Sequence, residues 1–355
     1  MDKLFPNNTS KILSNESTMH NVVNCQLVQS NMWYVEDLTT VYIIACIFNF
    51  FFAIVAVVGN VLVLLAIIKT PALHKPSIFL MCNLAANDLA VGVLVQPIYV
   101  IYKVAEMNGL VTMSCYCGVV VNMLANLFSG MSFITVTCIS IDRYLALYLH
   151  LRYVAVVTTQ RVVKVFVVIW SINIIFVTFY PWKTSVALAY GILLIIACLI
   201  TATFTFTKIH IIVQRHRRKI NDLTAQSPNA LDRNPASLRG INIPKFWKSV
   251  LTMKYVYILL LVCFFPYMAT LATRVVIGLT KEYKMALNIT TTIIYINSSI
   301  NPIVYCFRLR EVRNAVLKVL GKRVREENTS GTFLSSSVGN RNSFVIQPSP
   351  RDHEL

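Results

Sequence analysis

The stretch NMLANLFSGMSFITVTCISIDRY, residues 122–144, decides the fold. It is an apolar run that ends abruptly in Asp142, Arg143 and Tyr144, and no Asp, Glu, Lys or Arg occurs between Met107 and Ile141. A soluble core helix needs neither this length nor this lack of charge, whereas a helix that crosses hydrocarbon needs about 17–25 mainly apolar residues. The stretch therefore predicts a helix that crosses a bilayer and ends in a charged group at the far face.

The composition extends this interpretation to the whole chain. Of the 355 residues, 56% are hydrophobic and only 13% are charged, against about 25% charged in a soluble domain. A strand period is absent, which argues against a β-barrel, and backbone groups in lipid must then be satisfied within helices. The sequence predicts an all-α membrane protein, a seven-transmembrane helix bundle with a short amphipathic eighth helix. The predicted spans are residues 41–68, 77–102, 110–141, 162–182, 184–212, 250–276 and 285–307.

The segments outside the bundle have clear boundaries. Residues 1–40 form a polar tail, residues 308–321 have the apolar spacing of an amphipathic helix, and residues 322–355 form a Ser/Thr-rich tail. The polar stretch Asn221–Pro244, which contains three prolines, is predicted to be a loop.

The distribution of basic residues predicts the orientation. With the N-terminus outside, 25 of the 32 Lys and Arg residues lie on the cytoplasmic side, as the positive-inside rule requires. The basic charge therefore suits the inner leaflet of the bilayer, and the spans argue against a nucleic-acid partner. Asn7, Asn8 and Asn15 lie in N-x-S/T sequons of the outer tail and are predicted glycosylation sites.

Three of the nine cysteines are placed on the outer side: Cys25 in the tail, and Cys115 and Cys117 at the outer end of the third predicted span. One disulfide from Cys25 to either Cys115 or Cys117 is expected, which leaves one thiol over. The sequence leaves the choice between the two pairings open.

Asp88 is the only acid within a predicted span, and an intramembrane carboxylate marks a functional site by default. A transporter or channel is the competing class, but it would show inverted repeats and several intramembrane charges. The spans also carry no paired acid and base or metal cluster, so the chain is not expected to be an enzyme.

Several motifs then occur in order: Gly59-Asn60, the Asn-Leu-Ala-x-x-Asp block that ends at Asp88, Asp142-Arg143-Tyr144, Trp170, Cys263-x-x-Pro266 and Asn301-Pro-x-x-Tyr305. In this order and in these spans they resemble a rhodopsin-type (class A) G-protein-coupled receptor. The very short outer connection after the fourth span resembles the melanocortin, lysophospholipid, cannabinoid and adenosine branch.

The resemblance implies a receptor in the plasma membrane that couples an extracellular ligand to a heterotrimeric G protein, with arrestin and receptor kinases acting on its tail. It implies a switch in which Arg143 pairs with Asp142 at rest and faces the G protein when the sixth span swings about Pro266. The switch residues are Asp142, Arg143, Tyr144 and Tyr305. No cofactor is implied apart from an allosteric sodium ion, held by Asp88, Ser132, Asn297, Ser298 and Asn301.

The chain also departs from the family pattern. Gly118 replaces the usual third-span cysteine, and Phe206 replaces a usual tyrosine of the fifth span. Phe246 stands where an acid would hold Arg143 against the sixth span. Without that contact, ligand-independent activity is expected.

The ligand is the least determined feature, because Ala125 stands where amine receptors place an acid and no lysine in residues 285–307 could hold retinal. The remaining pocket is aromatic with neutral polar groups, and we expect a small neutral or weakly acidic molecule or lipid; a peptide is the alternative. The predicted pocket residues are Tyr99, Tyr102, Asn122, Asn126, Ser129, Phe264, Tyr267, Thr291 and Tyr295.

Overall fold

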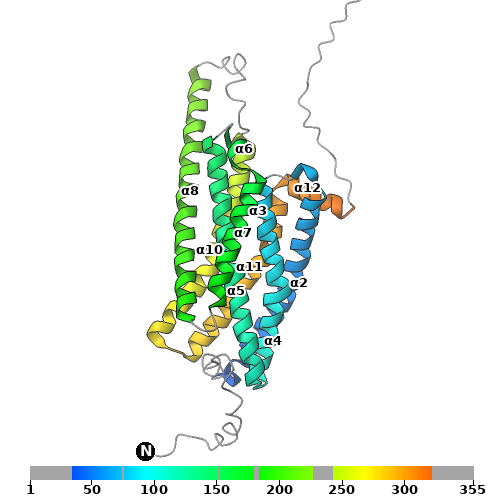
Figure 1. The fold of residues 1–355 in the computed structure, drawn as a ribbon, viewed down its shortest axis with the longest axis vertical. Helices are drawn as coiled ribbons and strands as arrows, with labels where there is room; N and C mark the ends of the chain where they lie inside the picture. Colours follow the sequence, from blue (N-terminus) through cyan, green and yellow to red (C-terminus); the bar gives the residue numbers. More distant parts are fainter. Residues whose placement is uncertain (1–33, 74–75, 150–151, 180–183, 227–242, 322–355) are drawn as a thin grey trace, which may run out of the picture.

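The structure, a computed structural model, describes residues 34–73, 76–149, 152–179, 184–226 and 243–321. These residues form a bundle of long, roughly parallel helices (Figure 1). The predicted glycosylation sites Asn7, Asn8 and Asn15, and the tail from residue 322 onward, lie outside the described residues.

The long helices that the structure describes are named here in their order along the chain. They are α2 (Thr39–Ile68), a second segment made of α3 (Pro76–Ala90), η6 (Val91–Val95) and α4 (Gln96–Met107), then α5 (Val111–Leu149), α7 (Thr159–Thr178), α8 (Thr184–Gln226), α10 (Ile243–Ile277) and α11 (Lys281–Arg308). Short helices are η4 (Glu36–Leu38), η5 (Pro71–Leu73), α6 (Tyr153–Val156) and α12 (Arg310–Val319). The predicted all-α bundle is confirmed.

Six of the described helical segments are long and apolar enough to cross a bilayer. The segment α11 is not among them, because its sequence is rich in Asn, Ser and Thr. These side chains are nevertheless buried, for example Asn288, Asn297 and Ser299. The polar face of α11 is therefore directed into the bundle and away from lipid.

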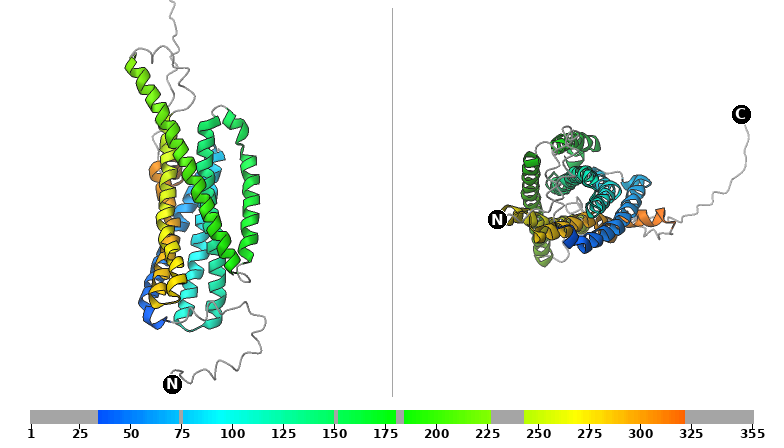
Figure 2. Two further views of the ribbon diagram at one scale, coloured as in Figure 1. Left: turned by 90° about the vertical axis from the view of Figure 1, so that its left-hand side faces the viewer. Right: turned by 90° about the horizontal axis from the view of Figure 1, so that it is seen from below.

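The helix that contains the deciding stretch, α5, occupies the middle of the bundle (Figure 2). It packs against α3, α4, α7, α8 and α10. The outer helix α2 instead exposes large apolar side chains such as Phe50 and Phe51. Such a surface suits contact with lipid rather than water.

A π-helical turn, η6, interrupts the second span between α3 and α4. Pro97 lies in the first turn of α4 and cannot donate a backbone hydrogen bond to the preceding turn. Gly92 lies within η6, where an added Cβ would approach the Ala53 carbonyl oxygen of α2 to 3.2 Å. The turn therefore sits at a close approach of two helices.

The loop prediction for Asn221–Pro244 is wrong at both ends. Helix α8 continues to Gln226, and α10 begins at Ile243; residues 227–242 lie outside the description. With 43 residues, α8 is about 65 Å long, and it extends beyond the rest of the bundle (Figure 1). The unbranched Lys, Arg and Gln side chains of its distal part favour a helix, and this outweighs the polarity that suggested a loop.

Buried and half-buried side-chain amides tie the helices together. Asn60 donates to the Ser298 carbonyl oxygen of α11 at 3.2 Å. Asn83 of α3 donates to Thr135 Oγ1 of α5 at 2.7 Å and accepts from Trp170 Nε1 of α7 at 3.2 Å. Each such bond contributes about 0.6 kcal/mol in a membrane protein. Together they fix the relative positions of the helices that carry the candidate site.

Candidate functional site

The acid and base at the end of the deciding stretch form an ion pair. Arg143 Nε donates to Asp142 Oδ2 at 3.0 Å, and Tyr153 of α6 donates its hydroxyl to Asp142 Oδ1 at 2.6 Å. Burial, and then the negative charge of Asp142, raise the pKa of the Tyr153 hydroxyl, which therefore stays protonated as a donor. Asp142 thus holds Arg143 on α5 and anchors the following loop.

The other predicted switch residues lie on two helices. Tyr144 stacks on Tyr148 of the same helix with ring centroids 5.8 Å apart. Tyr305 of α11 is fully buried, and its hydroxyl has no hydrogen-bond partner among the described residues. A buried donor without a partner is costly, so this tyrosine is a candidate to change its contacts when the helices move.

Sequence reasoning missed a contact between α8 and α10. The Tyr257 hydroxyl lies 2.9 Å from Thr203 Oγ1, and its ring packs against Phe206 with centroids 5.4 Å apart. Phe206 is the residue that replaces a usual tyrosine of the fifth span. Tyr257 of α10 therefore supplies a phenolic hydroxyl at an interface where α8 carries Phe206 in place of a tyrosine.

The carboxylate of Asp88 is buried in the centre of the bundle. It accepts a hydrogen bond from Asn301 Nδ2 at 2.8 Å. The amide oxygens of Asn297 and Asn301 are buried without a hydrogen-bond partner among the described residues. One carboxylate with nearby amide oxygens and serine hydroxyls is the donor set that a small hard cation prefers, so these residues fit the predicted sodium ion.

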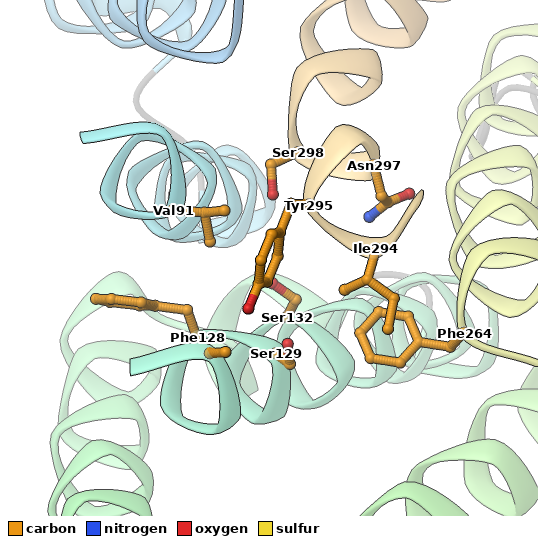
Figure 3. A pocket seen from close by; sticks show the side chains of 10 residues that line it. Val91, Phe128, Ser129, Ser132, Phe264, Ile294, Tyr295, Asn297 and Ser298 are labelled. Carbon is orange, nitrogen blue, oxygen red and sulfur yellow. The ribbon is translucent and has the colours of Figure 1, made fainter. Parts of the chain in front are cut away.

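A cavity of about 20 Å³ adjoins this polar centre. It has room for about one water molecule or one small ion. Tyr295 extends from α11 toward Ser129 and Ser132 of α5, and Phe264 closes the side formed by α10 (Figure 3). The lining residues are Val91, Ala125, Phe128, Ser129, Ser132, Phe264, Ile294, Tyr295, Asn297 and Ser298.

The cavity joins parts of two predicted sites. Ser132, Asn297 and Ser298 belong to the predicted sodium pocket, and Ser129, Phe264 and Tyr295 to the predicted ligand pocket. Phe264 also packs edge-on against Phe133, with centroids 4.7 Å apart. A ligand group that reaches Phe264 would therefore lie directly above the polar centre.

The remaining predicted pocket residues do not line this cavity. Asn122 and Asn126 donate to carbonyl oxygens of their own helix, at Gly118 and Asn122, and Asn126 is exposed. Tyr267 and Thr291 are half-buried. Tyr99 and Tyr102 are buried elsewhere, at the end of the bundle where α2 begins, which is called the N-terminal end below.

The ring of Tyr102 explains why residue 118 is a glycine. A Cβ at this position would approach Cε2 of Tyr102 to 3.0 Å. The absence of a side chain therefore allows the Tyr102 ring to pack against α5, at the position where the family resemblance predicts a cysteine. Cys115, one turn earlier, is disulfide-bonded, and Cys117 has a free thiol. Cys25 lies outside the described residues.

A buried ionic cluster at the N-terminal end was also missed. Lys103 Nζ lies 2.8 Å from Glu106 Oε2, and both side chains are buried. Lys284 of α11 is buried beside them. The predicted second span ended at residue 102, which placed Lys103 outside it; the i,i+3 spacing of Lys103 and Glu106 was the available signal.

Comparison with known proteins agrees with this geometry. Residues 59–181 match the model of the family described as 7 transmembrane receptor (rhodopsin family). Melanocortin receptor 3 of Rattus norvegicus is 25% identical over 278 residues, which cover 75% of this chain and 82% of that receptor. Trace amine-associated receptor 7h of the same organism is 26% identical over 312 residues, covering 81% of this chain and 84% of the relative.

A solved structure shows the same fold. Squid rhodopsin superposes with a TM-score of 0.67 at 17% identity, covering 79% of this chain and 86% of the squid chain. The family match includes Asp88 and the Asp142-Arg143-Tyr144 sequence. Together, these similarities support a class A, rhodopsin-like G-protein-coupled receptor near the melanocortin branch.

Proposed function

We propose that this G-protein-coupled receptor responds to a small neutral or weakly acidic molecule or lipid that reaches the cavity between α5, α10 and α11. The observation that carries the proposal is the composition of the cavity wall, because the cavity itself admits only about one water molecule or one small polar group of a ligand. The wall combines the rings of Phe264 and Tyr295 with the hydroxyl of Ser129, and it is continuous with Ser132 and Asn297 of the polar centre. Apolar walls with a few neutral polar groups are typical of small-molecule sites.

The chain's own residues suggest how binding is transmitted. A ligand group at Phe264 presses on α10 close to Pro266, where the helix lacks one backbone hydrogen bond. Movement of α10 about this point would separate Tyr257 from Thr203 of α8. The end of α5 that carries Arg143 would then become accessible to a G protein, and a ligand biases this equilibrium by its differential affinity for the two states.

The proposal includes the cellular setting. The receptor lies in the plasma membrane with its N-terminus outside, as the positive-inside rule indicates. Arrestin and receptor kinases act on the Ser/Thr-rich tail after residue 322, because phosphorylation there would add negative charge to an otherwise basic surface. The alternative ligand is a peptide, which the short connection between α7 and α8 would leave room for.

Replacing Ser129 with leucine tests the ligand site. The larger side chain fills the small cavity, and overpacking costs about 1–3 kcal/mol, so the response to a cavity ligand is expected to weaken about tenfold or more. The readout is G-protein dissociation in cells given decanamide, decanoate, decylamine or a defined peptide library. Asn126→Leu is the matched control, because Asn126 is exposed one turn away on the same helix.

The outcomes separate the two ligand classes. A decanamide or decanoate response that Ser129→Leu removes and Asn126→Leu retains supports the proposal. A peptide response that survives Ser129→Leu favours the alternative. A small-molecule response that is equal in both variants would exclude the cavity as the site.

Replacing Asp88 with asparagine tests the sodium proposal. Sodium bound at Asp88, Ser132, Asn297, Ser298 and Asn301 would stabilise the resting fold by about 2.7 kcal/mol at a roughly 100-fold excess over its Kd. The melting temperature of the purified wild type is therefore expected to rise when sodium replaces potassium, and Asp88→Asn should remove this difference. The exposed Asp37→Asn variant is the control. Equal sodium shifts in Asp88→Asn and wild type would contradict the assignment.

A further inference from the structure

One face of the second half of α8 carries a row of exposed side chains, apolar at first and then basic. The row is called the α8 stripe below and consists of Phe204, Lys208, Ile211, Arg215 and Arg218. Its members follow one another at intervals of four, three, four and three residues, which keeps them on one face of an α-helix. Ile209 and Val213, on the opposite face, are buried against the bundle. The α8 stripe therefore faces away from the rest of the protein.

The basic end of the α8 stripe begins beside an aromatic ring. Lys208 Nζ lies 5.4 Å from the ring centroid of Phe204, an arrangement that stabilises a cation next to an apolar surface. The sequence contains no Asp or Glu from Arg143 to Asn221, and the first acid of α8 is Asp222, beyond the stripe. Three positive charges thus follow a ring that suits contact with a hydrocarbon chain.

The length of α8 places these groups relative to the bilayer. The stretch Thr184–Thr207 carries no charged residue and spans about 36 Å as a helix, against about 30 Å of hydrocarbon. Phe204 therefore lies at the edge of the hydrocarbon, and Lys208 lies at the level of the lipid phosphates. Arg215 and Arg218 follow about 10 and 15 Å further along the helix axis. Because the head-group layer of one leaflet is about 5–8 Å thick, both arginines lie beyond the phosphates of an ordinary phospholipid.

We propose that the α8 stripe binds a phosphatidylinositol phosphate, an anionic lipid of the inner leaflet whose head group carries several phosphates. An acyl chain packs against Phe204, and Lys208 donates to the phosphodiester. The phosphorylated inositol ring projects from the membrane and reaches Arg215 and Arg218, whose guanidinium groups suit phosphate oxygens. A phosphatidylserine head group is too short to reach them. This inference rests on the orientation given in the proposed function, which places this end of α8 at the inner leaflet.

The site adjoins contacts between α8 and two other helices. Thr203, which precedes Phe204, lies 2.9 Å from the Tyr257 hydroxyl of α10. Thr205, which follows Phe204, donates to Ser140 Oγ of α5 at 2.8 Å. A lipid held at Phe204 therefore binds a turn of α8 that contacts both α5 and α10. If it binds one arrangement of these helices more tightly, it shifts the population toward that arrangement.

The test is native mass spectrometry of the purified full-length receptor in detergent, without ligand or G protein. The probes are dioctanoyl phosphatidylinositol 4,5-bisphosphate, dioctanoyl phosphatidylserine and free inositol 1,4,5-trisphosphate. The bisphosphate lipid is expected to bind at the lowest half-saturating concentration. The double variant Arg215→Gln/Arg218→Gln is expected to raise that concentration about tenfold or more, because each basic residue near a lipid surface adds to the attraction. Glutamine keeps the helix propensity of arginine.

The double variant Lys69→Gln/Lys164→Gln is the matched control. It removes the same charge from two exposed residues, one directly after α2 and one near the start of α7. Neither residue belongs to the α8 stripe, so binding of the bisphosphate lipid should be retained.

Each outcome decides the proposal. Tighter binding of the bisphosphate lipid that the arginine variant loses and the lysine control retains supports it. Equal binding of phosphatidylserine would indicate attraction to any anionic lipid, equal binding of the free trisphosphate would indicate a site for soluble anions, and equal losses in both variants would indicate net charge alone; each overturns it. If the arginine variant does not fold, Lys208→Gln must weaken binding, and retained binding overturns the proposal. Because no ligand or G protein is present, failure of the cavity as a ligand site would be seen separately.

Discussion

Replacing Arg143 with alanine is expected to lower ligand-independent G-protein activation about tenfold or more while leaving the receptor at the cell surface. The guanidinium of Arg143 is held by Asp142 in its own helix, and among the described residues no hydrogen bond links it to α10. The unliganded wild type should therefore signal appreciably. A coupling free energy of about 1–3 kcal/mol between partner and switch corresponds to roughly 5–150-fold, which sets the size of the expected loss.

The measurement is G-protein dissociation at matched surface expression, without added ligand. Tyr257→Phe is the opposing variant: it removes the hydroxyl contact with Thr203, so α10 is held less firmly against α8 and the signal should rise. A wild type that is silent at good expression would contradict the expected basal activity. An Arg143→Ala variant that signals like the wild type would contradict the role of the arginine.

Replacing Glu106 with alanine is expected to prevent most of the protein from reaching the cell surface. The change leaves the buried ammonium of Lys103 without the carboxylate 2.8 Å away. Removing one partner of a buried ion pair costs about 3–5 kcal/mol, a large share of a typical net stability of about 5–15 kcal/mol. Surface expression by flow cytometry and the melting temperature of the purified protein both measure this loss.

A double variant shows whether the loss of surface expression comes from the unpaired charge of Lys103 or from the missing packing of the Glu106 side chain. The double variant Lys103→Met/Glu106→Ala removes both charges of the pair and is expected to recover much of the expression. Glu282→Ala, an exposed acid in the first turn of α11, should have no effect. If the double variant is as unstable as Glu106→Ala alone, the missing packing of the Glu106 side chain, and not the unpaired charge, would be responsible.

The bundle could be predicted from the sequence because hydrocarbon imposes a simple rule on each span. The run from Met107 to Ile141 without a charged residue can satisfy its backbone only as a helix, and α5 follows from it. Asp88 and Arg143 could be singled out for the same reason, since charged side chains at membrane depth are rare. The loop beyond α8 could not be predicted, because polar residues outside the membrane suit a solvated helix as well as a loop.

The residues that line the ligand pocket were harder to predict, because their burial depends on how each helix is rotated about its own axis. Asn126 and Ser129 are both small polar residues on α5, yet Asn126 is exposed and Ser129 lines the cavity. The predicted second span ended before Lys103, but this side chain is buried and paired with Glu106. These differences depend on packing between helices, which periodicity along one helix does not determine.

The π turn η6 has a consequence for comparing this receptor with its relatives. A π turn contains one residue more than the corresponding α-helical turn, and one residue corresponds to about 100° of rotation. Aligned without a gap to a helix that lacks this turn, every residue of α4 would be assigned the environment of its neighbour. Lys103 and Glu106 would then be matched to positions on a different helix face. Ligand contacts should therefore be transferred to residues 96–107 only after a one-residue gap at Val91–Val95 has been considered.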